Sequence, residues 1–134
     1  SDGDKVEPNQ VFLAPGGQHL VVERRGYMDV IIELKGTPQV HGVRPAADVL
    51  FSSVARAYEN KDVLAIILTG MGNDGADGVR DLKTYCNCHC ITQNEESCVV
   101  FGMPKTVYEA GLSDEEVHID EIAGRIVDIV LGGG

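Results

Sequence analysis

The hydrophobic pattern is densest in the middle of the chain, where six consecutive apolar residues form the run Val63–Leu68. Three of the six, Val63, Ile66 and Ile67, are β-branched, and a run of this length and composition predicts a strand buried on both faces. A loop with several glycines follows, and then a helical pattern over residues 76–85. Strand, glycine loop and helix in this order indicate an α/β fold, in which binding and active sites lie beyond the carboxyl ends of the strands.

Weaker apolar patterns on both sides of this run predict the other elements. The further predicted strands are Val11–Ala14, Leu20–Glu23, Val30–Leu34, Cys86–Thr92 and Glu116–Ile119. Four helices are predicted. The first begins at Pro45, and the second runs over residues 76–85 and ends before a left-handed Asn87. The third begins at Met103, and the fourth follows Asp120, which caps it. Two successive β-α-β units from Val63 onward predict a doubly wound, mostly parallel sheet, with the hairpin of residues 20–34 as an antiparallel edge.

The glycine loop admits a nucleotide-binding interpretation. Residues Gly70–Gly75 match the pattern G-x-G-x-x-G of dinucleotide-binding turns, and Glu95 lies near the position of the acid that binds the ribose. A pyrophosphate, however, needs N–H groups at a helix N-terminus without a competing anion. Here Asp74 lies inside the loop and Asp77 just beyond it, on a chain with a formal charge of −10, so electrostatic repulsion disfavours this ligand.

Asp74 is also placed as the acid of a catalytic triad would be. A carboxylate in such a loop can orient a catalytic histidine, while N–H groups of the loop face a developing oxyanion. The simpler alternative is that Asp74 caps the helix that follows it. The loop alone does not decide between these two roles.

Four segments of the chain carry a resemblance to a known family. They are Ala14–His19, Arg44–Ala55, Leu68–Gly75 and Gln93–Pro104, and they cover most of the chain. In this order and spacing they resemble the catalytic domain of the bacterial chemotaxis protein-glutamate methylesterases, the CheB family. The resemblance implies part of a cytoplasmic response-regulator enzyme that hydrolyses glutamate γ-methyl esters by a Ser-His-Asp triad. Its implied partners are the cytoplasmic helices of methyl-accepting chemoreceptors.

The resemblance also assigns roles to single residues. Asp74 corresponds to the acid of the triad, and the backbone N–H of Met71 corresponds to an oxyanion donor. The residues expected to bind substrate are Arg44, Gly72, Asn73 and Met103. For Arg44, an ion pair at the start of its helix is the simpler alternative. No cofactor, metal, nucleic acid or membrane insertion is expected.

The other two triad members of the family lie in segments that the 134 residues do not contain. The nucleophile lies in a Gly-x-Ser-x-Gly-Gly-like turn and the histidine in a Gln-His-Met-Pro-like segment, and neither pattern occurs here. We therefore expect residues 1–134 to be the C-terminal part of the catalytic domain, with a sheet incomplete on its N-terminal side and no esterase activity alone. The uncovered sheet edge is expected to cause self-association or marginal stability.

Two other functions stay open on the sequence. One is a hydrolase built only from residues present, with Cys98 as nucleophile, His19 as base and Asp74 as the orienting acid. The simpler expectation for His19 is a hydrogen-bonded loop histidine. The other function is a non-catalytic binding domain that keeps the receptor-facing surface of the family.

Composition argues against a nucleic-acid-binding surface and against a cysteine metal site. With 43% hydrophobic and 24% charged residues the chain is an ordinary globular domain, and a pI near 4.6 argues against a nucleic-acid surface. Cys86, Cys88, Cys90 and Cys98 suggest a thiolate metal site that His89 would complete, but Cys-x-Cys-x-Cys within a strand lacks the spacing of zinc knuckles. We expect reduced thiols that pack as small apolar side chains.

Overall fold

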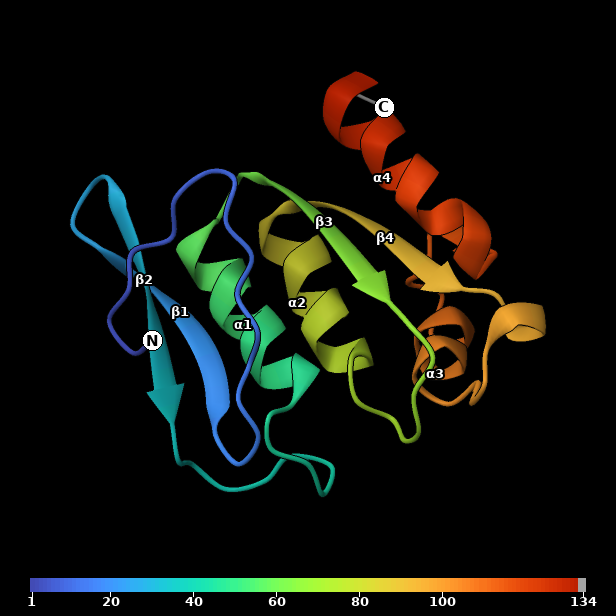
Figure 1. The fold of residues 1–134 in the computed structure, drawn as a ribbon, viewed down its shortest axis with the longest axis horizontal. Helices are drawn as coiled ribbons and strands as arrows, with labels where there is room; N and C mark the ends of the chain where they lie inside the picture. The colour runs from blue at the N-terminus through green and yellow to red at the C-terminus, as the bar shows by residue number, and fades with distance from the viewer. Residues whose placement is uncertain (133–134) are drawn as a thin grey trace.

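Three parallel strands form the central sheet of the structure, a computed structural model that describes residues 1–132 (Figure 1). The strands are β3 (Asp62–Ile67), β4 (Asn87–Gln93) and β5 (Glu115–Val117), hydrogen-bonded in that order. Helix α2 (Ala76–Tyr85) connects β3 to β4, and α3 (Met103–Glu109) connects β4 to β5. Both predicted β-α-β units are therefore confirmed.

Helices cover both faces of this sheet, which is the predicted doubly wound arrangement. On one face lie α1 (Ala47–Ala57), α2 and α3, and the core there consists of buried residues from these helices and from β3 and β4: Ala55, Ala65, Ile67, Ala76, Val79, Leu82, Cys90 and Val107. Helix α4 (Ile119–Gly132) covers the other face, where Ile122 is buried with Ile91. Leu64 and Ile66 remain only half-buried there. The expectation that β3 is buried on both faces is therefore right for one face only.

The hairpin of β1 (His19–Arg25) and β2 (Asp29–Lys35) forms a separate two-stranded sheet. It packs against α1, where the Val22 N–H donates to Ser53 Oγ (3.0 Å) and Arg24 Nε donates to the Ala57 carbonyl (2.7 Å). The hairpin was predicted correctly, but its placement as an edge of the parallel sheet is wrong. Within residues 1–132 it pairs with no strand of that sheet, because its hydrogen bonds to other elements go to α1 and to the N-terminal segment.

The predicted strand at Val11–Ala14 does not form. Val11 and Leu13 are 90% and 88% exposed, and the segment has an irregular backbone. A strand needs a neighbour to accept its backbone hydrogen bonds, and no strand of the described residues pairs with this segment. An apolar run of four residues was therefore not enough to predict one.

Three predicted helix ends are also wrong. Helix α1 begins at Ala47, two residues after Pro45. Asn87 is the first residue of β4, and its backbone is not left-handed. Helix α4 begins at Ile119, so Asp120 lies in its first turn and is not its cap, and β5 ends before Ile119. Each predicted boundary was based on the conformational preference of a single residue, whereas the observed boundary depends on contacts with neighbouring elements.

The four cysteines are free thiols. Cys90 is fully buried in the core, and Cys86 and Cys88 pack half-buried against it. Burial raises the pKa of the Cys90 thiol to about 12, and it also raises the pKa values of the Cys86, Cys88 and Cys98 thiols. The interpretation of the first three cysteines as core packing is confirmed, and as protonated thiols they are poor nucleophiles and poor metal ligands.

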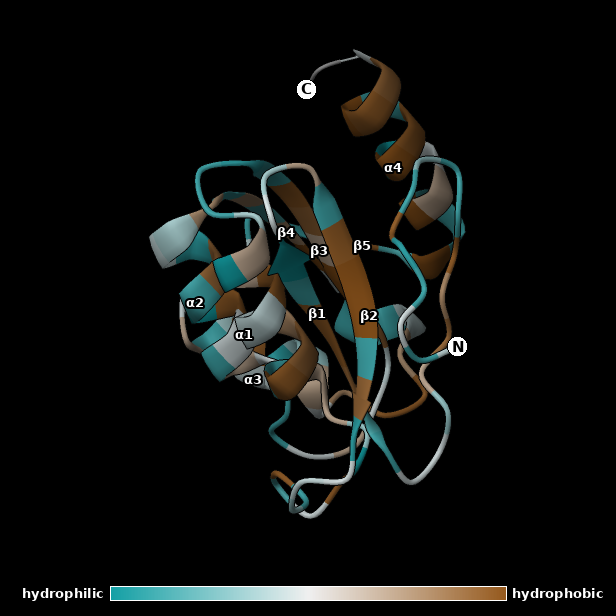
Figure 2. Cartoon of the chain, turned by 90° about the vertical axis from the view of Figure 1, so that its left-hand side faces the viewer, coloured by the Kyte–Doolittle hydropathy of each residue, from teal (hydrophilic) through white to brown (hydrophobic). Residues whose placement is uncertain are grey.

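Helix α4 leaves part of its apolar surface uncovered. Val127, Val130 and Leu131 are between 53% and 81% exposed, and Figure 2 shows apolar residues on α4 continuing beyond the sheet. Strand β3 is one of the two edge strands of its sheet within the described residues. Among residues 1–132 no helix combines the length and the apolar character that a bilayer span requires.

An ion-pair network between β5 and α4 gives the fold a pH dependence. Arg125 donates two hydrogen bonds of 2.8 Å to the Glu115 carboxylate, which His89 Nε2 also contacts. The Arg125 guanidinium, and after it the His89 hydrogen bond, lower the pKa of Glu115 from 4.5 to about 2. Because the folded pKa is the lower one, the stabilisation is complete above the unfolded value and is lost as the pH falls from about 5 toward 2.

We expect Glu115→Gln to lower the free energy of unfolding by about 1 kcal/mol at pH 7 and by less at pH 3, where the wild-type carboxylate is largely protonated in the unfolded chain. Urea denaturation at both pH values measures the difference. Glu116→Gln is the control, since Glu116 is exposed and forms no ion pair within residues 1–132. A loss at Glu115 that does not change with pH would contradict this assignment.

Candidate functional site

The four segments that carry the family resemblance meet at one end of the molecule. Residues 68–75 follow β3 and residues 94–102 follow β4, so both loops lie beyond the carboxyl ends of parallel strands, as predicted. The segment 44–55 contains the N-terminus of α1, which binds the first of these loops. Residues 14–19 join it through a hydrogen bond from the Gly17 N–H to the Arg44 carbonyl (3.2 Å).

Backbone hydrogen bonds join the loop after β3 to the loop after β4. The Gly70 N–H donates to the Val100 carbonyl (3.0 Å), and the Gly70 carbonyl accepts from the N–H groups of Gly102 (3.0 Å) and Met103 (2.9 Å). A Cβ on Gly102 would lie 2.7 Å from the Gly70 carbonyl oxygen, so only glycine permits this approach. Thr69 Oγ1 accepts the Val100 N–H (2.8 Å). The two loops therefore form one continuous backbone surface.

A buried glutamine fixes the spacing of these loops. Gln93, the last residue of β4, is 2% exposed; its Oε1 accepts the Thr69 N–H (2.8 Å) and its Nε2 donates to the Ser97 carbonyl (2.7 Å). A buried amide is costly unless it is hydrogen-bonded, and here both of its ends have partners. Sequence reasoning used Gln93 only as part of a family segment. The signal that it missed is a polar residue at the end of a strand that is otherwise buried.

Asp74 is buried and is bound to the N-terminus of α1. It is 6% exposed, and its two carboxylate oxygens accept the N–H groups of Ala47 (2.5 Å) and Asp48 (2.9 Å). The simpler role considered for Asp74, a cap on the following helix, is wrong, because the helix it caps is α1 and not α2. A carboxylate offers about four lone-pair positions, so Asp74 can still accept a further donor such as an imidazole N–H.

Asp48 makes the reciprocal contact with the N-terminus of α2. Its Oδ1 accepts the N–H groups of Gly75 (3.0 Å) and Gly78 (2.7 Å), and the residue is 6% exposed. The two helices thus cap each other through Asp74 and Asp48, and each carboxylate lies at the positive end of a helix dipole. The sequence alone did not indicate that Asp48 would contact α2. The missed signal is its spacing of seven residues from the buried Ala55, which puts both on one face of α1.

This geometry argues against a dinucleotide at Gly70–Gly75. The N–H groups that a phosphate would need at the start of α2 already bind Asp48. Burial raises the pKa of Asp48, the charges of Asp74 and Asp77 raise it further, and the N–H groups of α2 act in the opposite direction. A diphosphate would add negative charge where three carboxylates are already close together.

Met71, Gly72 and Asn73 form the exposed part of the loop after β3. The Met71 side chain is 82% exposed, and its backbone N–H donates no hydrogen bond to any residue from 1 to 132. Gly72 has a φ of +98°, which favours glycine. Asn73 Oδ1 accepts a hydrogen bond from Thr106 Oγ1 of α3 (3.3 Å). A backbone N–H without a partner, close in sequence to a buried carboxylate, is available for an oxyanion.

The two other residues expected to bind substrate lie at the margins of this loop pair. Met103 starts α3 and is half-buried over Gly70, where a Cβ would lie 2.9 Å from its Sδ. Arg44 donates through Nη1 to the carbonyls of Gly36 (3.3 Å) and Thr37 (3.2 Å). The ion pair considered for Arg44 does not form with any acid of the described chain, and its Nε is buried without a partner. The structure therefore gathers Met71, Gly72, Asn73, Asp74 and Met103, and turns Arg44 toward the loop before α1.

The hydrolase built from Cys98, His19 and Asp74 has no support in this geometry. His19 is fully buried at the start of β1, and its Nε2 contacts the Pro38 carbonyl (2.9 Å). Cys98 Sγ contacts the Gln93 carbonyl (3.7 Å). Within the described chain no hydrogen bond joins any two of the three side chains, although a nucleophile and its base must lie within reach of each other. His19 is the hydrogen-bonded structural histidine that was expected, in a strand and not in a loop.

Comparisons with known sequences agree on one family. A family model described as CheB methylesterase matches residues 1–126. A relative from Syntrophus aciditrophicus, named protein-glutamate methylesterase/protein-glutamine glutaminase 2, is 43% identical over 97% of this chain and 37% of its own length. The similarly named protein of Treponema denticola is 45% identical over 93% of this chain and 33% of its own length. The chain therefore spans about a third of the curated relatives that it matches.

A solved structure shows the same architecture. The crystal structure of the Thermotoga maritima CheB methylesterase catalytic domain superposes with a TM-score of 0.89 at 36% identity. The match covers 96% of this chain and 67% of that chain. The fold class expected from the sequence is thus confirmed by a structural relative as well as by the arrangement of strands and helices.

Proposed function

The chain belongs to the CheB methylesterase family, and on that premise we propose that it is the part of a protein-glutamate methylesterase that supplies the triad acid and an oxyanion donor. One observation carries the proposal: a buried Asp74, fixed by two N–H groups of α1, lies three residues from a Met71 N–H that has no partner in residues 1–132. In this proposal residues 1–134 are the C-terminal part of the catalytic domain. The serine and histidine then belong to a preceding part of the protein.

The proposed reaction follows from these positions. The serine oxygen attacks the carbonyl of a glutamate γ-methyl ester, and the histidine takes the serine proton and passes it to the departing methoxide oxygen, which leaves as methanol. Asp74 holds the histidine in the required tautomer and stabilises its charged form. The Met71 N–H donates to the oxyanion, and one such donor is worth about 3 kcal/mol. Water then hydrolyses the acyl-enzyme and leaves a glutamate side chain.

The proposed substrates are the cytoplasmic helices of methyl-accepting chemoreceptors, which would place the protein in the cytoplasm. Gly72, Asn73 and Met103 lie on the joined loops and would contact the receptor helix there. Arg44 would have to exchange its bonds to the carbonyls at residues 36 and 37 for a carbonyl or carboxylate of the receptor. The names of the relatives include a glutaminase activity, and the same acyl transfer on a glutamine side chain would release ammonia instead of methanol.

The test compares residues 1–134 with the whole product of the gene that encodes them, using a receptor fragment that carries glutamyl methyl esters. We expect methanol release by the whole product and none above background by residues 1–134, because no serine of these residues lies in a strand-to-helix elbow. In the whole product, Asp74→Ala should lower kcat about 10⁴-fold per folded molecule. Asp120→Asn is the control, since this acid lies in the first turn of α4 and is exposed.

Three outcomes would overturn the proposal. Turnover by residues 1–134, lost in Cys98→Ala, would mean a hydrolase of another design. A whole product that binds receptor fragments without hydrolysing them would mean a non-catalytic binding domain of the same fold. Retained activity in folded Asp74→Ala would remove this residue from the triad.

A further inference from the structure

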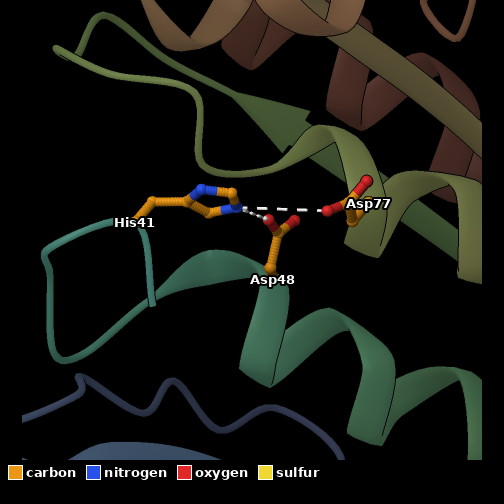
Figure 3. A group of neighbouring side chains, drawn as sticks. All are labelled: His41, Asp48 and Asp77. Atoms are coloured by element: carbon orange, nitrogen blue, oxygen red, sulfur yellow. Dashed lines mark hydrogen bonds and ion pairs between the residues drawn. The ribbon is translucent and has the colours of Figure 1, made fainter. Parts of the chain in front are cut away.

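A histidine and two aspartates from three segments converge beside the N-termini of α1 and α2 (Figure 3). His41 lies in the loop before α1, Asp48 in the first turn of α1, and Asp77 in the first turn of α2. His41 Nε2 is 3.1 Å from Asp48 Oδ2 and 4.0 Å from Asp77 Oδ2. One ligand atom from each residue lies within 4.8 Å of the other two.

We propose that His41, Asp48 and Asp77 bind a divalent transition-metal ion, and that Zn²⁺ fits them best. One imidazole nitrogen and two carboxylate oxygens make a three-ligand set that leaves a fourth position for water. Imidazole selects zinc and its neighbours over magnesium and calcium, and the Irving–Williams order favours zinc over manganese at such a site.

Two of the three distances between ligand atoms can be compared with those of a loaded site. With ligand bonds of about 2.1 Å, neighbouring ligand atoms around a metal lie about 3.0–3.4 Å apart. The His41–Asp48 distance of 3.1 Å already has this value, and the His41–Asp77 distance of 4.0 Å needs only a small closure. The Asp77 side chain is 69% exposed, so it can make this movement without disturbing the core.

Asp48 is fixed in the orientation that a metal ligand needs. Its Oδ1 is held by the N–H groups of Gly75 and Gly78, which leaves Oδ2 directed at His41. Hydrogen bonds to the second oxygen of a ligating carboxylate orient it in known metal sites. Asp77 is oriented in a similar way, because its Oδ1 accepts a hydrogen bond from Arg80 (3.0 Å).

The charge balance also favours a cation. Asp48, Asp74 and Asp77 bring three carboxylates to the junction of the two helices, and the basic side chains of residues 1–132 that contact them are His41 and Arg80. An ion here would connect the loop before α1 to α2. The inference departs from the sequence expectation of no metal, because the ligands are 7 and 29 residues apart and form no local motif.

The test is metal binding by purified protein, with a readout independent of esterase activity. Calorimetric titration with ZnCl₂ should show one site per chain. Titration with Co²⁺ should give visible d–d bands without a sulfur-to-cobalt charge-transfer band, because the ligands are nitrogen and oxygen. His41→Ala and Asp77→Asn should each raise the dissociation constant at least about tenfold. Asp48 is left unchanged because it also caps α2.

His118→Ala is the matched control. His118 Nδ1 also lies near a carboxylate, 3.6 Å from Asp120, but it forms no group of three ligands in the described chain. Its dissociation constant should equal that of the wild type. Affinity that His41→Ala and Asp77→Asn leave unchanged, a charge-transfer band that reports cysteine ligands, or no binding in the titration would each overturn the proposal.

Discussion

Asp74→Asn is expected to lower the free energy of unfolding by about 2–4 kcal/mol, whereas Asp48→Asn should lower it by less than about 1 kcal/mol. Both oxygens of Asp74 accept backbone N–H groups, from Ala47 and from Asp48. An asparagine at position 74 must therefore turn its NH₂ group toward one of these donors. That buried N–H loses its acceptor, and the N-terminus of α1 loses its negative charge.

The same substitution at Asp48 meets different partners. Only Oδ1 of Asp48 accepts backbone N–H groups, from Gly75 and Gly78, and an asparagine keeps this oxygen. Its NH₂ group would face His41 Nε2, which accepts a hydrogen bond in one neutral tautomer. Burial raises the pKa of Asp48, so the folded protein disfavours this anion and a neutral side chain recovers part of that cost.

Urea denaturation of both variants and the wild type at pH 7 measures this asymmetry. The two substitutions are chemically identical and the two residues are equally buried, so each serves as the control for the other. Equal losses, or a larger loss for Asp48→Asn, would contradict the difference in acceptor geometry between the two carboxylates. The stability loss also affects activity measurements, because an Asp74 variant has less folded protein. A loss of turnover in such a variant therefore reports catalysis only after correction for the folded fraction.

The parts of the fold that could be predicted from the sequence are those with a local signal. Neighbouring residues alone specify a strand, a loop and a helix here, through the apolar run from Val63 to Leu68, the glycines after it, and the inward Val79 and Leu82. All three elements are present in the structure. The hairpin was also predicted correctly, because the two short apolar runs around Gly26 pair with each other and lie close together in the sequence. Its position against α1 was not predicted, because the contacts of Val22 and Arg24 with that helix join residues 31 and 33 positions apart.

The candidate site divides in the same way. The glycine pattern and the family resemblance located Asp74 and Met71 at the carboxyl end of a strand, which is correct. The partners of Asp74 could not be predicted, because the two N–H groups that it binds belong to residues 26 and 27 positions earlier in the chain. The convergence of His41 with Asp48 and Asp77 is invisible for the same reason. Long-range packing alone brings these groups together.

Gly78→Ala is expected to destabilise the fold by about 3 kcal/mol, through overpacking between α1 and α2. A Cβ on Gly78 would lie 2.6 Å from the Cβ of Phe51 and 3.1 Å from the Cα of Asp48. The added methyl group would have to push α1 away from α2. It would also lie 3.1 Å from Asp48 Oδ1, the oxygen that accepts the Gly78 N–H, so the cap on α2 would lengthen as well.

Gly124→Ala provides a control of opposite sign. Gly124 lies inside α4, is exposed, and has nothing within 4 Å of where its Cβ would be. Since alanine favours a helix over glycine by about 0.5–1 kcal/mol, this variant should unfold at a higher denaturant concentration than the wild type. A neutral or stabilising Gly78→Ala would mean that α1 and α2 can separate at little cost. The carboxylates of Asp48 and Asp74 would then not be held at the distances that the reciprocal capping requires.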